Sequence, residues 1–481
     1  MKLSDCISQL KYECRGNDVE VTSLEMDSRK VNPGALFFCI PGGNVDGHDF
    51  ASDVQKKGAS ALIVDHWLDV SLPQVKVDDV REAMSLVAET FFDYPTEKLK
   101  MIAVTGTNGK TSTTYMVKTI AEACGKKVGL MGTIANYIGS EKIETDMTTP
   151  DPIALQSLLA QMVEANVDWV VMEASAHALY LRKLKGIRYD ISIFSNLTED
   201  HLDFFETMER YYQAKTLLFT NEMTDKSIIN IDDDYGKRLF GETETACVSY
   251  SAKQQADYQA DNIISDVSGV RYDMVYNRQK YHVSVDIPGE FTVYNTMAAI
   301  AACIEMGLDP KKVIESIGVL HSVPGRCESL NTMGHGFGII LDYAHTPDAI
   351  ENILTTVRRF TRNRLIILFG CGGNRDKKKR PIMGEMAARY ADYCIVTSDN
   401  PRFEEPEDII DDILPGVEAH TTPYKTIVDR IEAIRFGLDL AQDGDVLVLA
   451  GKGHETYQDV KGVKHHFDEK EIVQQLLSNM K

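Results

Sequence analysis

Short apolar runs alternate with amphipathic segments along most of this chain. Residues 101–106 (MIAVTG) form a short, mostly apolar run, and residues 111–124 (TSTTYMVKTIAEAC) carry apolar side chains at helical spacing. Residues 151–166 begin with Asp and Pro, which is typical of the first turn of a helix. Further runs that predict buried strands lie at 168–174, 190–196 and 226–232. Strands that alternate with helices predict a mostly parallel sheet with helices on both faces.

The alternation begins again after residues 323–326 (VPGR) and continues to the end of the chain. Residues 347–360 predict a helix with Pro in its first turn. The apolar runs lead into four polar segments, DYAHTPD, GCGGNRD, SDNPR and GKGHE. Because open α/β sheets bind ligands at the carboxyl ends of their strands, these segments predict a ligand site.

The first part of the chain has a different pattern. Shorter apolar runs, one of them at 61–64, are mixed with turns, and the polar stretch 93–100 predicts a linker. We therefore predict an α/β fold in which a central parallel sheet is followed by a Rossmann-like domain. The three predicted domains are 1–97, 98–325 and 326–481.

The composition is that of a globular protein, with 43% hydrophobic and 26% charged residues. A length of 481 residues fits about three domains. The 51 basic and 72 acidic residues give a net charge of −21, so we expect no nucleic-acid partner and no attraction to an anionic membrane. The absence of a membrane-length apolar segment or a signal peptide predicts a cytoplasmic protein without membrane insertion. The nine dispersed cysteines fit reduced thiols.

The sharpest chemical signal is GTNGKTS, residues 106–112, which follows an apolar run and opens a helical one. In that context glycines let backbone N–H groups approach phosphate oxygens, and the helix N-terminus adds positive potential. Lys110 can reach the outer phosphates, and the hydroxyl of Thr111 can bind Mg²⁺. Val104 stands where the longer GxxxxGK[ST] spacing needs glycine, so we predict a shortened phosphate loop.

Polar residues after the following strand candidates extend this prediction. Glu173 and His201 follow two such runs, and their carboxylate and imidazole could hold Mg²⁺ beside the phosphate loop. At Asn230 the spacing fits a nucleotide contact and a simple polar turn equally well. Arg326 could reach a phosphate across the domain boundary or lie exposed in a turn. The sequence context of Lys215 alone is typical of a surface lysine.

Taken together, these motifs resemble those of the Mur ligase family, which builds the peptide of bacterial cell-wall precursors. The resemblance covers almost the whole chain and includes TGTNGKTS, EASAH, NLTEDHLDFF, YYQAK, VPGR, DYAHTPDA, FGCGGNRDKKKRP and GKGHETYQ in family order. Asp27-Ser28-Arg29, with PGALFFCIPGG and DGHDF, resembles the domain that holds a UDP moiety. The segment DNPR is similar to that of family members that add meso-2,6-diaminopimelate.

The resemblance implies an amide ligase that depends on ATP and Mg²⁺. Such an enzyme adds meso-2,6-diaminopimelate to the D-glutamate γ-carboxylate of UDP-N-acetylmuramoyl-L-alanyl-D-glutamate through an acyl phosphate, in peptidoglycan precursor synthesis. The alternatives are the same reaction with L-lysine, a folylpolyglutamate synthase-like ligase, and a nucleotide-dependent switch protein. The resemblance also implies UDP-binding, ATP-binding and amino-acid-binding domains in that order, and we expect a monomer with small-molecule substrates.

The family motifs assign site residues to four groups. The ATP contacts are Gly106, Thr107, Asn108, Gly109, Lys110, Thr111, Ser112, Asn230, Asn295, Arg326, Asp342 and His345. The muramoyl-dipeptide contacts are Ser28, Thr148, Thr149, Ser175 and Lys183. The diaminopimelate contacts are Arg375, Asp399, Asn400, Pro401, Arg402, Gly451 and Glu455. The metal ligands are Thr111, Glu173, His201 and Lys215 as a carbamate, and the catalytic residues are Lys110, Lys215 and His201.

The amino-acid pocket implied by the resemblance is chemically reasonable. Diaminopimelate has a second ammonium–carboxylate end that lysine lacks, so Arg402 could pair with its carboxylate and Glu455 could accept from its ammonium. Lysine would leave a desolvated Arg402 unpaired. The positions that differ from the usual family pattern are Ala176, Lys183, Phe205, Thr292 and Asn374, of which Asn374 belongs to this pocket.

Overall fold

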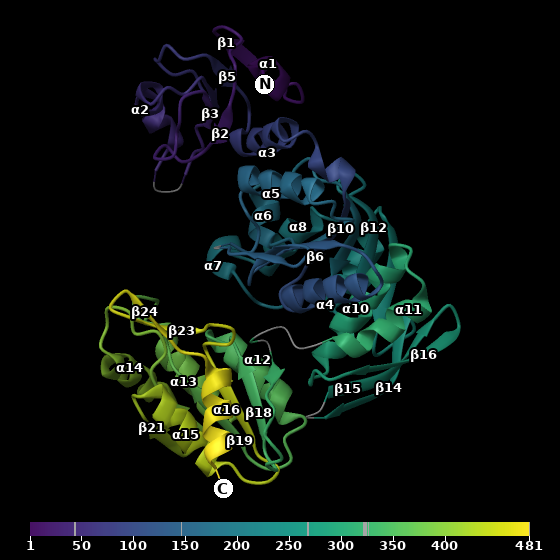
Figure 1. The fold of residues 1–481 in the computed structure, drawn as a ribbon, viewed down its shortest axis with the longest axis vertical. Helices are drawn as coiled ribbons and strands as arrows, with labels where there is room; N and C mark the ends of the chain where they lie inside the picture. Colours follow the sequence, from purple (N-terminus) through teal and green to yellow (C-terminus); the bar gives the residue numbers. More distant parts are fainter. Residues whose placement is uncertain (43–44, 146, 267–268, 321–324, 326, 481) are drawn as a thin grey trace. The chain divides into compact units, whose positions relative to one another are not determined.

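The computed structural model describes residues 1–480 except 43–44, 146, 267–268, 321–324 and 326 (Figure 1). Its strands form three larger sheets and one two-stranded sheet. By contacts the chain divides into two compact units, the first of Met1–Gln259 with Tyr294–Ser316 and the second of Ala260–Val293 with Ile317–Lys481. The α/β class predicted from the sequence is confirmed, and none of the described helices is long and apolar enough to span a bilayer.

The first sheet belongs to the N-terminal part of the chain and has the order β1-β5-β4-β3-β2. Strands β2 to β5 run parallel, and β1 pairs with β5 in the antiparallel direction. The strands are β1 (Glu13–Arg15), β2 (Ser23–Glu25), β3 (Ala35–Phe38), β4 (Ala61–Val64) and β5 (Gln74–Lys76). The helical elements are α1 (Leu3–Cys6), η1 (Gly47–Phe50), α2 (Ala51–Lys56), α3 (Val80–Phe91) and η2 (Pro95–Lys98).

The central sheet has the order β16-β15-β14-β13-β12-β11-β6-β10-β7-β8-β9. Its parallel core consists of β6 (Lys100–Thr105), β7 (Val128–Met131), β10 (Trp169–Glu173), β11 (Tyr189–Phe194), β12 (Thr224–Asn230) and β13 (Ala246–Ser251). The remaining strands are β8 (Asn136–Ile138), β9 (Glu141–Ile143), β14 (Tyr258–Asp266), β15 (Gly269–Tyr276) and β16 (Gln279–Val285).

The helices that accompany this sheet follow the sequence pattern closely. They are α4 (Lys110–Ala123), α5 (Pro152–Glu164), α6 (Ala176–Tyr180), α7 (Leu202–Phe205), α8 (Met208–Thr216), α9 (Asp234–Glu242), α10 (Phe291–Glu305), α11 (Pro310–Glu315) and η3 (Ser316–Val319). The predicted helices at 111–124 and 151–166 and the predicted strands at 101–106, 168–174, 190–196 and 226–232 are confirmed within a few residues. The polar stretch 93–100, predicted as a linker, connects α3 to β6 and contains the 3-10 turn η2, which packs against α5.

The third sheet has the order β17-β18-β22-β19-β20-β21, and all its strands except β17 are parallel. Its strands are β17 (Glu328–Ser329), β18 (Gly338–Asp342), β19 (Leu365–Phe369), β20 (Tyr393–Val396), β21 (Tyr424–Thr426) and β22 (Val446–Ala450), and β23 (Tyr457–Val460) pairs with β24 (Val463–His466). Its helices are α12 (Pro347–Arg358), α13 (Lys379–Tyr390), α14 (Pro406–Glu418), α15 (Arg430–Leu440) and α16 (Glu469–Asn479).

Successive residues of a strand point to opposite faces, and this sheet therefore has two cores. Leu365 and Ile367 belong to a cluster with side chains of α12, α13 and α14. Ile366 and Leu368 belong to a separate cluster with α15 and α16. Because helices cover both faces, the strands are continuously apolar, and only their ends are left for polar chemistry.

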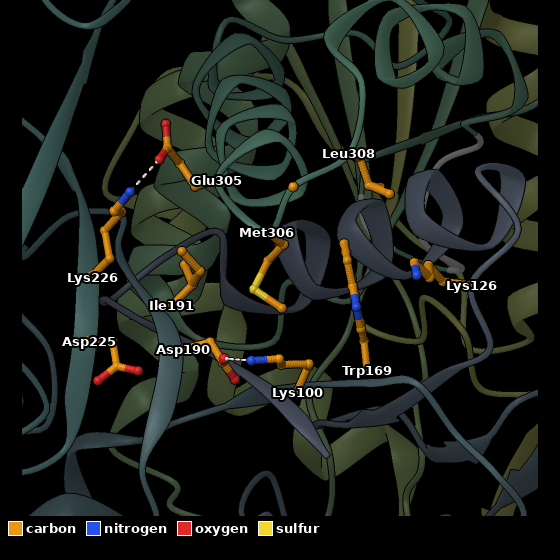
Figure 2. Close-up of a pocket in the computed structure, with 11 residues that line it drawn as sticks. Lys100, Lys126, Trp169, Asp190, Ile191, Asp225, Lys226, Glu305, Met306 and Leu308 are labelled. Atoms are coloured by element: carbon orange, nitrogen blue, oxygen red, sulfur yellow. Dashed lines mark hydrogen bonds and ion pairs between the residues drawn. The ribbon is translucent and has the colours of Figure 1, made fainter. Parts of the chain in front are cut away.

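At the amino ends of the central strands the sheet has a cavity of about 510 Å³ (Figure 2). Four of its charged side chains form two ion pairs. Lys100 Nζ lies 2.6 Å from Asp190 Oδ1, and Lys226 Nζ lies 2.7 Å from Glu305 Oε2. Asp225 pairs instead with Arg188, and the ammonium of Lys126 lies over the ring of Trp169.

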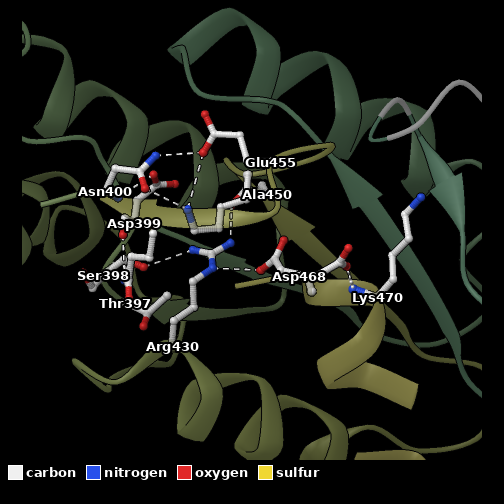
Figure 3. A network of polar contacts seen from close by, with 12 residues as sticks. Thr397, Ser398, Asp399, Asn400, Arg430, Ala450, Glu455, Asp468 and Lys470 are labelled. Atoms are coloured by element: carbon white, nitrogen blue, oxygen red, sulfur yellow. Dashed lines mark hydrogen bonds and ion pairs between the residues drawn. The ribbon is translucent and has the colours of Figure 1, made fainter. Parts of the chain in front are cut away.

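A buried arginine holds the carboxyl ends of two strands of the third sheet together (Figure 3). Arg430, at the start of α15, donates to Ser398 O (3.2 Å) and Ala450 O (2.9 Å). Its Nε also donates to Glu469 Oε1 of α16 at 2.8 Å, and both side chains are at most 1% exposed. A buried cation without its counter-charge is strongly destabilising, so Glu469 keeps this bridge between strand ends in place.

We expect Glu469→Gln to lower the free energy of unfolding by about 3 kcal/mol, because the substitution leaves the Arg430 charge buried without a carboxylate. The matched control is Glu471→Gln in the same helix. The exposed carboxylate of Glu471 pairs with His466, and this pair should contribute less than about 1 kcal/mol to the free energy of unfolding. Urea unfolding of both variants provides the measurement. Equal losses in the two variants would contradict the importance of the buried pair.

Candidate active site

The phosphate-loop segment connects β6 to α4 at the carboxyl edge of the central sheet. Gly109 has φ +87° and forms the N-cap of α4, and Gly106 has φ +147°. A Cβ at Gly106 would lie 1.9 Å from Ser195 Oγ, so only glycine fits this backbone. Lys110 Nζ donates to Gly106 O (3.0 Å) and Thr107 O (2.8 Å), which keeps its ammonium over the loop.

The end of β11 holds the loop in shape. Thr107 N donates to Asn196 O, and Asn108 N donates to Asn196 Oδ1, each at 2.9 Å. Ser195 Oγ donates to Asn108 O at 2.6 Å. These contacts follow from the register of β6 and β11, which pairs Thr105 with Phe194 and so brings the residues after both strands together.

Glu173 is the last residue of β10 and is completely buried. Its Oε1 accepts from Thr111 Oγ1 (3.0 Å) and from Thr133 N (2.8 Å), and its Oε2 accepts from Thr133 Oγ1 (3.1 Å). The carboxylate and the Thr111 hydroxyl thus offer hard oxygen atoms at the first turn of α4. Such donors suit Mg²⁺, and the assignment of both residues as metal ligands stays a prediction.

Glu173 and His201 do not follow neighbouring strands of the sheet. β10 and β11 lie on opposite sides of β6, and His201 follows β11 by seven residues in a left-handed backbone conformation (φ +54°). Its Nε2 lies 3.3 Å from Asp200 Oδ2, and its ring packs edge-on against His177. Its assignment as a metal ligand stays a prediction.

Lys215 is a buried lysine, although its sequence context is typical of the surface. It lies at the end of α8, is 1% exposed, and donates to Gly106 O at 2.8 Å. Burial lowers the pKa of its ammonium well below 10.5, and the nearby Lys110 charge lowers that pKa further. A lysine with a lowered pKa next to the phosphate loop fits the role that the family motif implies.

Two asparagines predicted as nucleotide contacts, Asn230 and Asn295, contact residues at the carboxyl edge of the central sheet. Asn230, which ends β12, donates through Nδ2 to Ser195 O (2.8 Å) and accepts from Asp232 N (3.1 Å). A Cβ at Gly109 would lie 2.5 Å from Asn295 Oδ1, so the α10 side chain contacts the start of α4. Neither contact tests a nucleotide role, which stays a prediction for both residues.

Three of the predicted dipeptide contacts surround the end of β10. Thr149 Oγ1 donates to Glu173 O (2.8 Å) and lies 3.2 Å from Ser175 Oγ, while Thr148 Oγ1 lies 3.1 Å from Thr133 Oγ1. Ser175 also caps α6.

The other two predicted dipeptide contacts are Lys183 and Ser28, which come from different parts of the chain. Lys183 Nζ pairs with Asp151 Oδ1 at 2.5 Å. Ser28 follows the carboxyl end of β2, and its carbonyl oxygen accepts from Lys57 Nζ at 2.6 Å.

A second polar cluster lies at the carboxyl ends of β20 and β22 (Figure 3). Asn400 Nδ2 donates to Glu455 Oε2 at 2.8 Å, and Asn400 Oδ1 accepts from Lys452 Nζ at 3.0 Å. Lys452 Nζ also lies 3.4 Å from Glu455 Oε2. Burial raises the pKa of Glu455 and lowers that of Lys452, so the pair must remain close to keep both charges.

Glycines let neighbouring loops approach this cluster. A Cβ at Gly451 would lie 2.5 Å from Asp399 Oδ2, and one at Gly373 would lie 1.9 Å from Pro401 O. Arg402 takes φ +51° and donates through Nη1 to Gly373 O at 2.8 Å. The structure therefore brings the polar segments GCGGNRD, SDNPR and GKGHE together.

The remaining predicted residues are more dispersed. Arg375 is exposed in the loop after β19, and His345 is exposed after β18, with Nδ1 2.8 Å from Tyr343 O. Asp342, which ends β18, accepts from Cys327 N (2.7 Å) and Ala344 N (2.8 Å). Arg326 lies outside the described residues.

Sequence reasoning missed two residues that orient predicted site residues. Thr133 orients Glu173, and Lys452 orients Asn400 and Glu455. The sequence contains a feature that could have identified both residues. Thr133 follows Gly132 directly after β7, and Lys452 stands between two glycines directly after β22, so each belongs to a strand-end loop like the one that carries Lys110.

Family models match most of the chain. The Mur ligase middle domain matches residues 104–303, the Mur ligase glutamate ligase domain matches 325–453, and the Mur ligase family catalytic domain matches 20–92.

Whole-length relatives give the same result. The UDP-N-acetylmuramoyl-L-alanyl-D-glutamate--2,6-diaminopimelate ligase 1 of Clostridium acetobutylicum is 47% identical over 100% of both chains. The ligase of the same kind from Geobacillus thermodenitrificans is 42% identical over 98% of both chains. A solved structure of a UDP-N-acetylmuramoyl-L-alanyl-D-glutamate--2,6-diaminopimelate ligase superimposes with a TM-score of 0.71 at 33% identity, covering 95% of each chain.

The parallel sheet, the phosphate loop and the oxygen donors around Glu173 define an ATP-dependent ligase. The chain belongs to the Mur ligase family. The fold is shared with a MurF ligase from Thermotoga maritima solved in complex with ADP, at a TM-score of 0.59 and 17% identity over 95% of this chain and 97% of that one.

Gly109→Ala should reduce ATP affinity at least about tenfold, because the new Cβ would push against Asn295 and strain a backbone that needs a positive φ. Gly125→Ala is the matched control, since Gly125 has φ +88° at the other end of α4 and open space around it. Calorimetric titration of ATP into both variants provides the measurement. If both variants bind ATP equally well, the close packing of the loop is unimportant for nucleotide binding.

Proposed function

We propose that this chain joins meso-2,6-diaminopimelate to the γ-carboxylate of the D-glutamate in UDP-N-acetylmuramoyl-L-alanyl-D-glutamate, with ATP as the energy source. The observation that carries the proposal is the convergence of the phosphate loop, Glu173 and Lys215 at one sheet edge, where Gly106 O accepts from both Lys110 and Lys215. The names of the whole-length relatives supply the substrates. The domain roles follow in chain order, with UDP, ATP and the amino acid bound by 1–97, 98–325 and 326–481.

The reaction has two chemical steps. The γ-carboxylate attacks the γ-phosphorus of ATP, the bond to the bridging oxygen breaks, and an acyl phosphate and ADP form. A neutral amine of the amino acid then attacks the acyl carbon, phosphate leaves with the bonding electrons, and the nitrogen gives up one proton as the amide forms. The loop amides and Lys110 stabilise the charge that moves between phosphate oxygens. Binding all three substrates in one enzyme supplies much of the rate through proximity.

The residues that would hold Mg²⁺ are Thr111, Glu173, His201 and Lys215 as a carbamate. When bound, the ion offsets phosphate charge. As a free amine Lys215 lacks the oxygen atoms that Mg²⁺ prefers, but its lowered pKa makes the neutral, nucleophilic form available. Attack of that amine on CO₂, with loss of one proton, gives an anionic carbamate that offers oxygen atoms to the metal. We therefore propose that Lys215 is carbamylated in the active enzyme.

We expect protein incubated with ¹³C-bicarbonate to show one carbamate carbon signal at pH values well below the ordinary lysine pKa of 10.5, because the depressed pKa leaves Lys215 deprotonated there. The Lys215→Met variant should lose both the signal and most of the activity, while Lys226→Met should keep both. ¹³C NMR gives the measurement. A signal that persists in Lys215→Met assigns the carbamate elsewhere and contradicts the proposal.

The C-terminal cluster supports diaminopimelate over lysine as the added amino acid. Glu455 is held by Asn400 and Lys452, so its carboxylate is already oriented to accept from an ammonium group. Arg402 carries a guanidinium that suits a second carboxylate, which lysine does not have. Its Nη1 donates to Gly373 O at 2.8 Å and its Nε lies 3.9 Å from Asp459 Oδ2, and a guanidinium has further N–H groups that a ligand could use.

The direct test measures ATP-dependent phosphate release with UDP-N-acetylmuramoyl-L-Ala-D-Glu and either diaminopimelate or L-lysine. We expect diaminopimelate to be the better acceptor. Arg402→Ala should lower kcat/KM for diaminopimelate about 100-fold and leave the KM for ATP unchanged, because truncating one partner of a desolvated charge pair costs several kcal/mol.

Lys461→Ala is the matched control, since Lys461 is an exposed cation whose backbone N donates to Arg402 O at 2.6 Å and whose side chain pairs at 3.4 Å with Glu405. It should keep the diaminopimelate preference. An unchanged preference in Arg402→Ala refutes the pocket assignment, and a preference for lysine in the parent refutes the choice of amino acid. Release that depends on a folate instead of the muramoyl peptide favours a folylpolyglutamate synthase-like activity. We expect a monomer in the cytoplasm, which size-exclusion chromatography and fractionation can check.

A further inference from the structure

Two histidines and an aspartate come together in the N-terminal part of the chain, outside the site described above. They are His48, Asp65 and His66, and their ligand atoms lie within 4.8 Å of one another. His48 lies in η1 after β3, and the other two residues follow β4 directly. Because β3 and β4 are parallel neighbours, with Phe38 paired to Ile63, both connections leave the sheet at the same edge.

A single carboxylate oxygen lies between the two imidazoles. Asp65 Oδ1 is 3.2 Å from His48 Nε2 and 2.5 Å from His66 Nδ1. The two rings stack with centroids 4.4 Å apart. His48 is buried, whereas 60% of the His66 side chain is exposed, so the cluster has one fixed inner donor and one outer donor that can adjust.

The inner donor is oriented by another carboxylate. His48 Nδ1 lies 2.6 Å from Asp46 Oδ1, which also accepts from His48 N at 2.9 Å and caps η1. This pairing at Nδ1 turns Nε2 towards Asp65. Histidine ligands of metal ions are commonly held in this way, with one ring nitrogen on a carboxylate and the other on the metal.

We propose that His48, Asp65 and His66 bind a first-row divalent transition-metal ion of the Zn²⁺ type. Two imidazole nitrogens and a carboxylate oxygen match the donors that Zn²⁺ takes, and water can complete a tetrahedral set. The nitrogen donors disfavour Mg²⁺, which prefers oxygen, so this site is distinct in chemistry from the one around Glu173. Buried Cys39 does not belong to this group, whose ligand atoms within 4.8 Å of one another come from His48, Asp65 and His66.

The ion would join the connection after β3 to the end of β4. Ser28 follows β2, the parallel neighbour of β3, so it leaves the sheet at the same edge. A bound ion would stabilise the sheet edge of the N-terminal part, and the proposal does not depend on the proposed ligase function.

The test uses the full chain, freed of metal by chelation and then titrated with ZnCl₂ in excess Mg²⁺. We expect one saturable zinc site per chain and a zinc-dependent rise in Tm. His66→Asn, at an exposed position that folding tolerates, and Asp65→Asn should each weaken zinc binding at least about tenfold and abolish the rise in Tm. His466→Asn is the matched control, because His466 is an exposed imidazole paired with the single carboxylate of Glu471, and it should bind zinc like the parent.

Cobalt offers a second readout of the donor set. Co²⁺ at a nitrogen–oxygen site should give visible d–d bands without a thiolate charge-transfer band. A thiolate band, zinc affinity that is unchanged in both variants, or no saturable zinc binding by the parent would each overturn the proposal. Unchanged ligase activity in His66→Asn is expected and keeps this test separate from that of the proposed function.

Discussion

The register of the parallel strands is the constraint on which the site depends. In the central sheet, Thr105 pairs with Phe194 and Val104 pairs with Glu173, so the residues that follow β6 and β11 and the last residue of β10 meet at one edge. A shift of one residue would turn Glu173 to the opposite face of the sheet. The C-terminal sheet repeats the arrangement, with its polar loops after β19, β20 and β22.

Charges buried at these edges are each supported by several partners. Glu173 accepts three hydrogen bonds, Lys215 donates to a loop carbonyl, and Arg430 joins two strand ends to Glu469. Isolated buried charges are unfavourable, so these partners explain how the sheet edges can hold charge in a dry environment. Lys215 differs from these groups because its burial lowers its pKa and favours the neutral, nucleophilic amine. This form of the side chain is the one that can react.

Strand and helix positions could be predicted well where the apolar pattern was long and regular, as in residues 151–166 and 168–174. The hairpin strands β15 and β16 were not predicted, because the prediction relied on continuous apolar runs and these strands alternate buried with more exposed positions. The connection at 93–100 contains the turn η2, whose packing against α5 the polar sequence did not reveal. The phosphate loop was recognised because a contiguous motif carries its chemistry.

The sequence by itself determined the α/β class, the phosphate loop with Lys110 and Thr111, and the family to which the chain belongs, since each depends on local order along the chain. Only the tertiary structure decided that Lys215 is buried beside Gly106, that Thr133 orients Glu173, and that Lys452 orients Glu455. These pairings, like the meeting of His48 with Asp65, mostly join residues from different strand ends. Burial and pKa arise from such long-range contacts, and residue spacing carries no record of them.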